Sequence, residues 1–164
     1  MQNEIKKMES NTEELLQLVS FKIGNEEFGI EILQVQEINR MMQITKVPNS
    51  HDFVEGVVNL RGRIIPVVDL RKRLNLHSAE HDNNTRIIVV DLEGSTLGFV
   101  VDEVSEVLRI SSSITEPPPP LVAGINSEYI TAVGKLEDRL LILLDLKKIF
   151  SNEENKLIEQ VVQE

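Results

Sequence analysis

Several residue types are missing or scarce in this chain of 164 residues, and each absence excludes a class of function. Without cysteine there can be no disulfide, no thiol catalysis and no zinc site built from thiolates. Tryptophan is absent and aromatic residues make up 4%, so base-stacking platforms for single-stranded nucleic acid are poorly supplied. Lys and Arg number 17 against 27 Asp and Glu, and the resulting net charge of -10 repels a phosphate backbone. We therefore expect no binding to nucleic acid.

Long apolar runs are also lacking. The longest apolar stretches, 64–68 and 140–144, have the length of a strand and fall far short of a membrane span. No succession of basic, apolar and small residues opens the chain, so we expect no signal peptide. With 41% apolar and 27% charged residues, the chain is predicted to be globular, soluble and cytoplasmic, without insertion into a membrane.

What the chain does contain is an internal repeat. Residues 60–74, LRGRIIPVVDLRKRL, match residues 136–150, LEDRLLILLDLKKIF. Residues 28–38, FGIEILQVQEI, match residues 97–107, LGFVVDEVSEV. We infer a duplication, in which positions shared by the two copies serve the fold. Positions at which the copies differ are then the better candidates for function.

Short strands are expected in both copies. Alternation of apolar and polar residues over 18–32 predicts a hairpin that turns at Gly24 and Asn25. Asp69 and Asp145 each follow an apolar strand and precede Leu and two basic residues, which predicts the N-caps of two short helices. The other strands are expected over 35–38, 44–47, 53–60, 63–68, 85–92, 96–101, 129–133 and 139–144.

These elements predict a mostly β fold with two small barrels or rolled sheets packed together. We expect a mobile tail over 1–17, a first barrel half over 18–80 and a second over 81–150. Residues 151–164 carry apolar residues at helical spacing and are predicted to form a short amphipathic helix that docks on the barrels.

Groups suited to catalysis or metal binding are few. The three histidines, His51, His77 and His81, all stand in polar, loop-like segments. No phosphate-binding loop, nucleophile elbow or zinc-protease motif occurs, and no serine has a histidine placed beside it by the sequence pattern. We therefore expect no metal, no cofactor and no enzymatic activity, and interpret the chain as a binding module.

One stretch carries a family resemblance. EEFGIEILQVQEI, followed by FVEGVVNLRGRIIPVVDLRKRL, closely resembles the CheW-type coupling proteins of bacterial chemotaxis, and the likeness spans residues 18–150. The resemblance implies two intertwined five-stranded SH3-like barrels that together form one coupling-protein domain. It also implies a non-catalytic adaptor that joins the cytoplasmic tips of chemoreceptors to the regulatory domain of a histidine kinase. Assembly into a ring with the kinase would follow if the contacts between modules close.

The resemblance also implies a receptor-binding set. Its members are Val35, Glu37, Arg61, Gly62 and Val107. Arg61 is the strongest candidate, because the second copy has Glu137 at the equivalent place and the fold therefore does not require arginine there.

For the kinase we expect contacts at the edge or apolar face of the second barrel, with Val89, Leu97 and Gly98 as candidates. A β-barrel protein that binds oligonucleotides or oligosaccharides is the alternative. The scarcity of aromatic residues and the negative charge of the chain disfavour it.

Overall fold

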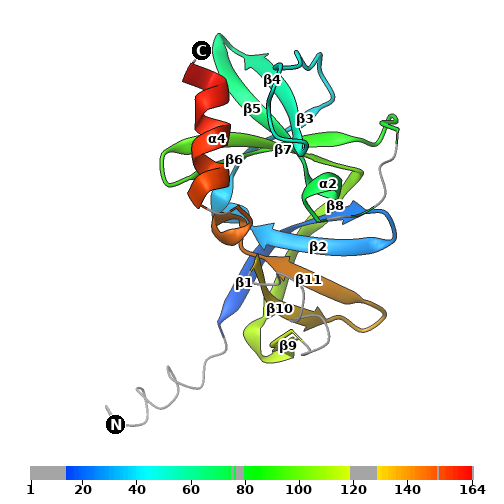
Figure 1. Cartoon of the computed structure of the whole chain (residues 1–164). Coiled ribbons are helices and arrows are strands. Elements are labelled where there is room, and N and C mark those ends of the chain that lie inside the picture. Colours follow the sequence, from blue (N-terminus) through cyan, green and yellow to red (C-terminus); the bar gives the residue numbers. More distant parts are fainter. Residues whose placement is uncertain (1–13, 75, 77–79, 119–128, 151, 164) are drawn as a thin grey trace.

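Figure 1 shows the computed structural model, which describes residues 14–74, 76, 80–118, 129–150 and 152–163. The described chain is mostly β, as predicted, and its strands form two sheets. The strands are β1 (Leu15–Ile23), β2 (Glu26–Glu31), β3 (Val35–Arg40), β4 (Val54–Leu60), β5 (Arg63–Asp69), β6 (Arg86–Leu92), β7 (Ser95–Val101), β8 (Glu103–Ser111), β9 (Thr115–Glu116), β10 (Ile130–Lys135) and β11 (Leu140–Leu144). The helical elements are η1 (Ile32–Gln34), α2 (Leu70–Arg73), η2 (Ser112–Ile114), η4 (Leu146–Lys148) and α4 (Asn152–Gln163), and the last confirms the predicted C-terminal helix.

The two sheets repeat one strand order. The six-stranded sheet runs β8-β1-β2-β11-β10-β9 and the five-stranded sheet runs β3-β6-β7-β5-β4. In each, one parallel pair joins the two hairpins: Leu143 lies opposite Gly29 in the first sheet, and Val67 lies opposite Gly98 in the second. These four residues occupy matching places in the sequence repeat, so the architecture confirms the inferred duplication.

The barrels are intertwined because each gives a strand to the other. After β2 the chain leaves the six-stranded sheet, and β3 pairs with β6 in the other sheet. After β7 the chain returns, and β8 pairs with β1. The halves predicted over 18–80 and 81–150 therefore do not coincide with the sheets, since each sheet takes strands from both halves.

Two strand predictions need correction. β1 begins at Leu15, inside the segment expected to be a tail, because Leu15 and Leu16 pair with the last residues of β8. The strand expected over 44–47 is reduced to a single bridge between Thr45 and Val57. Residues 1–13, the remainder of the predicted tail, lie outside the described residues.

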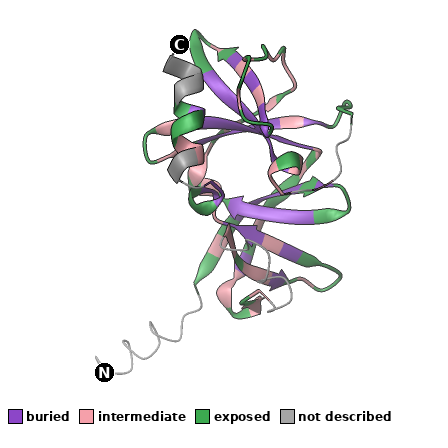
Figure 2. Cartoon of the chain, in the orientation of Figure 1, coloured by how far each residue is buried: buried purple, intermediate pink, exposed green. Residues whose placement is uncertain are grey.

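The core has three parts. One cluster fills the interior of the five-stranded barrel, another fills the interior of the six-stranded barrel, and the largest lies between the two. Figure 2 shows the buried residues along the middles of the strands and the exposed residues at the hairpin tips. The large cluster includes a row of stacked rings, with Phe53 5.1 Å from Phe150 and Phe150 6.1 Å from Phe99. Most of the hydrophobic stabilisation therefore depends on the two barrels remaining packed together.

The predicted aspartate caps are confirmed. The Oδ1 atom of Asp69 accepts a hydrogen bond from the amide of Arg71 at 2.9 Å, and Oδ1 of Asp145 accepts one from the amide of Lys147 at 3.0 Å. Each cap satisfies an amide of the first helical turn that would otherwise lack a partner, an interaction typically worth about 1 kcal/mol.

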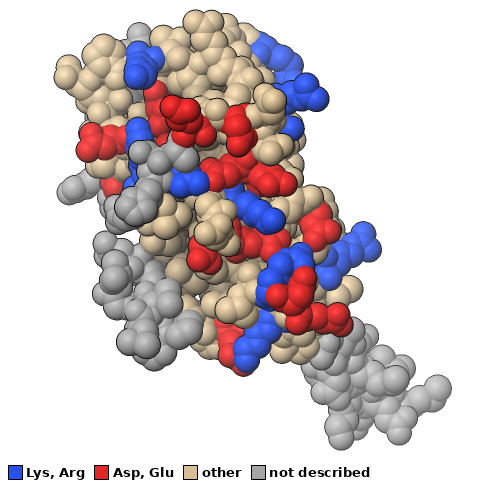
Figure 3. Space-filling view, turned by 90° about the vertical axis from the view of Figure 1, so that its right-hand side faces the viewer, with Lys and Arg blue, Asp and Glu red and all other residues tan. Residues whose placement is uncertain are grey.

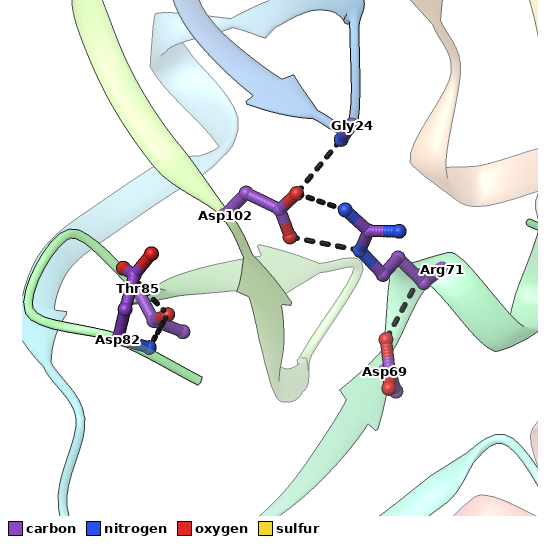
Figure 4. A network of polar contacts seen from close by, with 6 residues as sticks. All are labelled: Gly24, Asp69, Arg71, Asp82, Thr85 and Asp102. Atoms are coloured by element: carbon purple, nitrogen blue, oxygen red, sulfur yellow. Dashed lines mark hydrogen bonds and ion pairs between the residues drawn. The ribbon is translucent and has the colours of Figure 1, made fainter. Parts of the chain in front are cut away.

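A polar network ties the barrels together where the chain crosses between them (Figure 4). Asp102 stands between β7 and β8, and its Oδ1 accepts a hydrogen bond from Arg71 Nε at 3.0 Å. Its Oδ2 accepts from the amide of Gly24, in the β1–β2 turn, at 2.7 Å and also pairs with the Arg71 guanidinium. Burial raises the pKa of Asp102, but the bonds from Arg71 and Gly24 outweigh it, so this pKa lies below the usual range.

Replacement of Asp102 by asparagine is expected to lower the free energy of unfolding at pH 7, because the negative charge that pairs with Arg71 is lost. The loss is expected to be about 1 kcal/mol, because solvent partly screens the ion pair. The folded pKa lies below the unfolded value of about 3.9, so the stabilisation is present above that pH and disappears as the pH falls through the folded pKa. Urea unfolding at several pH values checks this. The neighbouring exposed Glu103→Gln is the control, and a difference between Asp102→Asn and the unaltered chain that grows on acidification would contradict the assignment.

Candidate functional site

The structure brings together two residues of the predicted receptor set, Glu37 and Arg61. Glu37 lies on β3 and Arg61 begins the turn between β4 and β5, at opposite edges of the five-stranded sheet. The guanidinium of Arg61 pairs with Oε2 of Glu37, so the pair bridges the seam where the sheet closes into a barrel. The Arg61 side chain is 72% exposed and that of Glu37 is 23% exposed, which places a positive charge in solvent over a partly covered carboxylate.

The carboxylate of Glu37 is held ionised. Nδ2 of Asn39, two residues along β3, donates a hydrogen bond to Oε1 at 2.7 Å. This bond, together with the bond and charge of Arg61, lowers the pKa of Glu37. Asn39 is a contributor to the site that the sequence alone did not single out, because nothing in the repeat shows that alternate residues of β3 face the same seam.

The turn that carries Arg61 has an unusual backbone. Arg61 has φ 52° and Gly62 has φ 83°, so both central residues are left-handed, as a two-residue hairpin turn of type I′ requires. The amide of Gly62 donates to Oδ1 of Asn59 at 2.9 Å, and there is open space where a side chain of Gly62 would stand. Gly62 therefore shapes the turn that presents Arg61.

The remaining receptor candidates lie apart from this pair. Val35 begins β3, opposite Val90, and is half-buried against the large core. Val107 lies on β8 in the other sheet, opposite Val19, and is 57% exposed. The structure therefore places Glu37, Arg61 and Gly62 at one seam of the five-stranded barrel, Val35 beside it and Val107 on the six-stranded barrel.

Exposed apolar side chains accompany both seams. Ile38 follows Glu37 and Ile64 follows the Arg61 turn, and both side chains are exposed. Their counterparts in the repeat, Val107 and Leu140, are exposed as well. The signal that could have found Ile38 and Ile64 is the recurrence of an apolar residue at both places, but a recurrent apolar residue is equally typical of a core.

The two copies arrange charges differently at equivalent seams. In the six-stranded barrel Glu106, the counterpart of Glu37, pairs with Arg139 at 3.0 Å, and Arg139 Nε also lies 2.5 Å from the buried Glu27. In the five-stranded barrel Arg63, the counterpart of Arg139, instead donates to Thr96 Oγ1 at 3.1 Å. The cation that pairs with Glu37 is therefore Arg61, the residue that differs between the copies.

The residues predicted to contact a kinase prove to be core residues. Val89 is 1% exposed within the five-stranded barrel, and Leu97 is 4% exposed in the large cluster. Gly98 is also buried, and a Cβ added there would lie 2.9 Å from Ile87 Cγ2. The prediction is corrected because these residues lie on two interior strands: β6 has β3 and β7 as neighbours, β7 has β6 and β5, and neither strand presents a free edge.

No group of three or more His, Asp or Glu side chains that could hold a metal ion occurs among the described residues. His51 and His81 are exposed and His77 lies outside the described residues. None of the described helices combines the length and the apolar character needed to cross a bilayer.

Two equivalent β-barrels that exchange strands place the protein in a class of double-barrel β proteins. Residues 17–154 match the CheW-like domain. The chain belongs to this family, which indicates a non-catalytic adaptor.

Named relatives support the family assignment over most of the chain. It is 43% identical to the chemotaxis protein CheW of Klebsiella aerogenes over 141 residues, which cover 86% of this chain and 85% of that protein. It is 35% identical to the chemotaxis protein CheW of Treponema pallidum over 146 residues, 87% of this chain and 86% of that protein. Among solved structures, the scaffolding protein TtCheW from Thermoanaerobacter tengcongensis matches with a TM-score of 0.78 and 35% identity, covering 86% of this chain and 96% of that one.

Proposed function

We propose that this chain is a cytoplasmic coupling protein of bacterial chemotaxis, which holds the cytoplasmic tips of chemoreceptors and the regulatory domain of a histidine kinase in one assembly at the inner face of the membrane. The observation that carries the proposal is the exposed Arg61 side chain, paired with the half-buried Glu37, on a barrel of the CheW-like family. A non-catalytic adaptor acts through such surfaces, because it can affect the activity of its partners only by binding them.

The receptor contact is assigned to Val35, Glu37, Arg61, Gly62 and Val107. Arg61 offers an exposed cation of fixed direction, because the left-handed turn and the Glu37 carboxylate orient it. Arginine is well suited to the rim of a protein interface, where its guanidinium can bind a partner carboxylate in two places. Ile38, the neighbour of Glu37 in sequence, is exposed as well and offers apolar area on the same strand.

The kinase contact is assigned to neither Val89, Leu97 nor Gly98, because these residues are buried. A binding site for nucleic acid is not favoured either. On the face shown in Figure 3, Asp and Glu side chains alternate with Lys and Arg, and the basic groups form no continuous stripe among the described residues there.

Reconstitution tests the proposal. The chain is immobilised and incubated with a chemoreceptor cytoplasmic fragment, with a kinase regulatory domain, and with both. Each partner is expected to be retained alone, and each is expected to change the affinity of the other by the same factor, because coupling free energy is reciprocal. Retention of neither partner at concentrations of about 100 μM, well above the dissociation constants of ordinary signalling complexes, would contradict the proposed function.

A further inference from the structure

Helix α4 is attached to the five-stranded barrel mainly through one described side chain. It follows η4 and lies along β5, on the left of Figure 1. Ile158 is 1% exposed and enters the large core, whereas the adjacent Leu157 is 46% exposed. Of the side chains described in α4, which belong to residues 154–159, Ile158 alone is fully buried. Within residues 154–159, the helix therefore has one apolar anchor, and a helix with few buried side chains is easier to separate than one that buries a whole face.

Two polar contacts of α4 with the barrels are long. Oε1 of Glu159 accepts a hydrogen bond from Ser95 Oγ at 3.3 Å, and Oε1 of Glu154 lies 3.7 Å from Arg73 Nη2. The first is exposed and the second exceeds hydrogen-bond distance, so these two contacts contribute little to stability.

Two hollows flank the anchor. One of about 220 Å³ opens toward Lys147 and Leu92, and the other, of about 240 Å³, opens toward Ile64 and Pro66. Both share walls formed by Ser95, Leu97, Ile158 and Glu159. Both hollows open to the surface beside Ile158, so α4 leaves parts of this face of β5 and β7 uncovered.

The covered face has the chemistry of a groove that binds a helix. Its floor is apolar, with Leu97 and Pro66 buried and Ile64 exposed at the edge. Cationic side chains of Arg63, Arg73 and Lys147 surround it. The helix that occupies it is acidic: its sequence, NEENKLIEQVVQ, has three glutamates and one lysine. The apolar floor therefore matches the apolar side of the helix, and the basic rim matches its acidic side chains.

We propose that the face beneath α4 is a docking groove for an acidic amphipathic helix, which α4 occupies within its own chain and vacates as a unit, so that a helix of the same chemistry from a partner can take its place. The partner helix carries a branched aliphatic residue at the position of Ile158 and carboxylates four residues before it and one residue after it, matching Glu154 and Glu159. This inference goes beyond the proposed coupling function, and its test requires neither receptor nor kinase.

The direct test uses a fluorescent peptide of residues 152–164 and the full chain carrying Ile158→Asp, which removes the anchor. The altered chain is expected to bind the peptide about tenfold or more tightly than the unaltered chain does, because α4 no longer competes for the groove. Leu157→Asp, which changes the exposed neighbour in the same way, is the matched control and is expected to behave as the unaltered chain. A folded Ile158→Asp chain that gives no saturable binding, or binds a peptide carrying Ile158→Asp equally well, would overturn the proposal.

Hydrogen exchange on the unaltered chain provides a second test that does not depend on the folding of a variant. Amides of α4 are expected to exchange about tenfold or more faster than those in the middle of β5 and β7, because the helix opens separately from the sheet. Exchange of α4 at the rate of these strands would show that it leaves only on global unfolding, and the groove would then be unavailable to a partner.

Discussion

Replacing Arg61 by glutamate is expected to weaken retention of a chemoreceptor fragment about tenfold or more while leaving the fold intact. The exchange places a like charge beside Glu37 and reverses the charge offered to the partner, and like charges across an interface are strongly unfavourable. The fold should tolerate glutamate there for two reasons. Glu93 already occupies a left-handed turn position with φ 52°, and Glu137 is the counterpart of Arg61 in the second copy. Binding is measured by pull-down or anisotropy, and folding by circular dichroism.

Two further variants distinguish contact from scaffolding. Lys135→Glu makes the same change of charge at an exposed cation paired with Glu116 at 2.6 Å, and it is expected to leave receptor binding unaltered. The double exchange Glu37→Arg with Arg61→Glu restores an ion pair with its polarity reversed. If the pair only braces the barrel seam, the double exchange should restore binding, and the assignment of Arg61 to the receptor contact would then be wrong.

Replacement of Gly56 by alanine is expected to lower the free energy of unfolding by about 3 kcal/mol, the sum of a left-handed backbone and a steric clash. Gly56 has φ 149°, and a Cβ there would lie 2.2 Å from the carbonyl oxygen of Thr45, which is less than the sum of the two van der Waals radii. The Thr45–Val57 bridge holds that carbonyl in place, so relief would require the bridge to break. A fall in Tm of about 10 °C, measured by thermal unfolding, is the corresponding result.

The effect of the clash can be separated from that of the backbone angle. Gly94 has φ 92° but no atom within 4 Å of an added Cβ, so Gly94→Ala is expected to show only the backbone cost, about 1 kcal/mol. In the second copy the counterpart of Gly56 is Ala132, which does not have a positive φ. The second copy therefore shows that alanine is accepted at this place of the repeat only with a different backbone angle. Equal losses for Gly56→Ala and Gly94→Ala would show that the Thr45 carbonyl gives way at no cost.

The sequence predicted the fold well wherever its information is local or repeated. Turn residues, alternation and the two aspartate caps depend on neighbours along the chain, and the structure confirms the hairpin at Gly24 and the caps at Asp69 and Asp145. The duplication predicted two equivalent units, because matching residues such as Val67 and Leu143 take equivalent positions in a repeated fold.

Long-range pairing was less accessible. β8 was not assigned as a strand because its charged residues obscure the alternation, and its partner β1 lies about half the chain length away in sequence. Val89 and Leu97 were placed on a surface because an apolar strand has the same composition whether it lies at an edge or at the centre of a sheet. Only the sheet order shows that β6 and β7 are interior strands. Arg61, by contrast, could be singled out because the comparison of copies removes positions that the fold itself requires.

The exchange of β3 and β8 has a consequence for how the molecule could be divided. A protease cut or a gene split in the connection between β5 and β6 would leave two fragments, each with an orphaned segment whose hydrogen-bonding partner sits on the other piece. Neither fragment would contain a complete barrel, so we expect the fragments to fold only when they associate. Because each sheet needs strands from both halves of the chain, the two barrels are expected to unfold in one cooperative step.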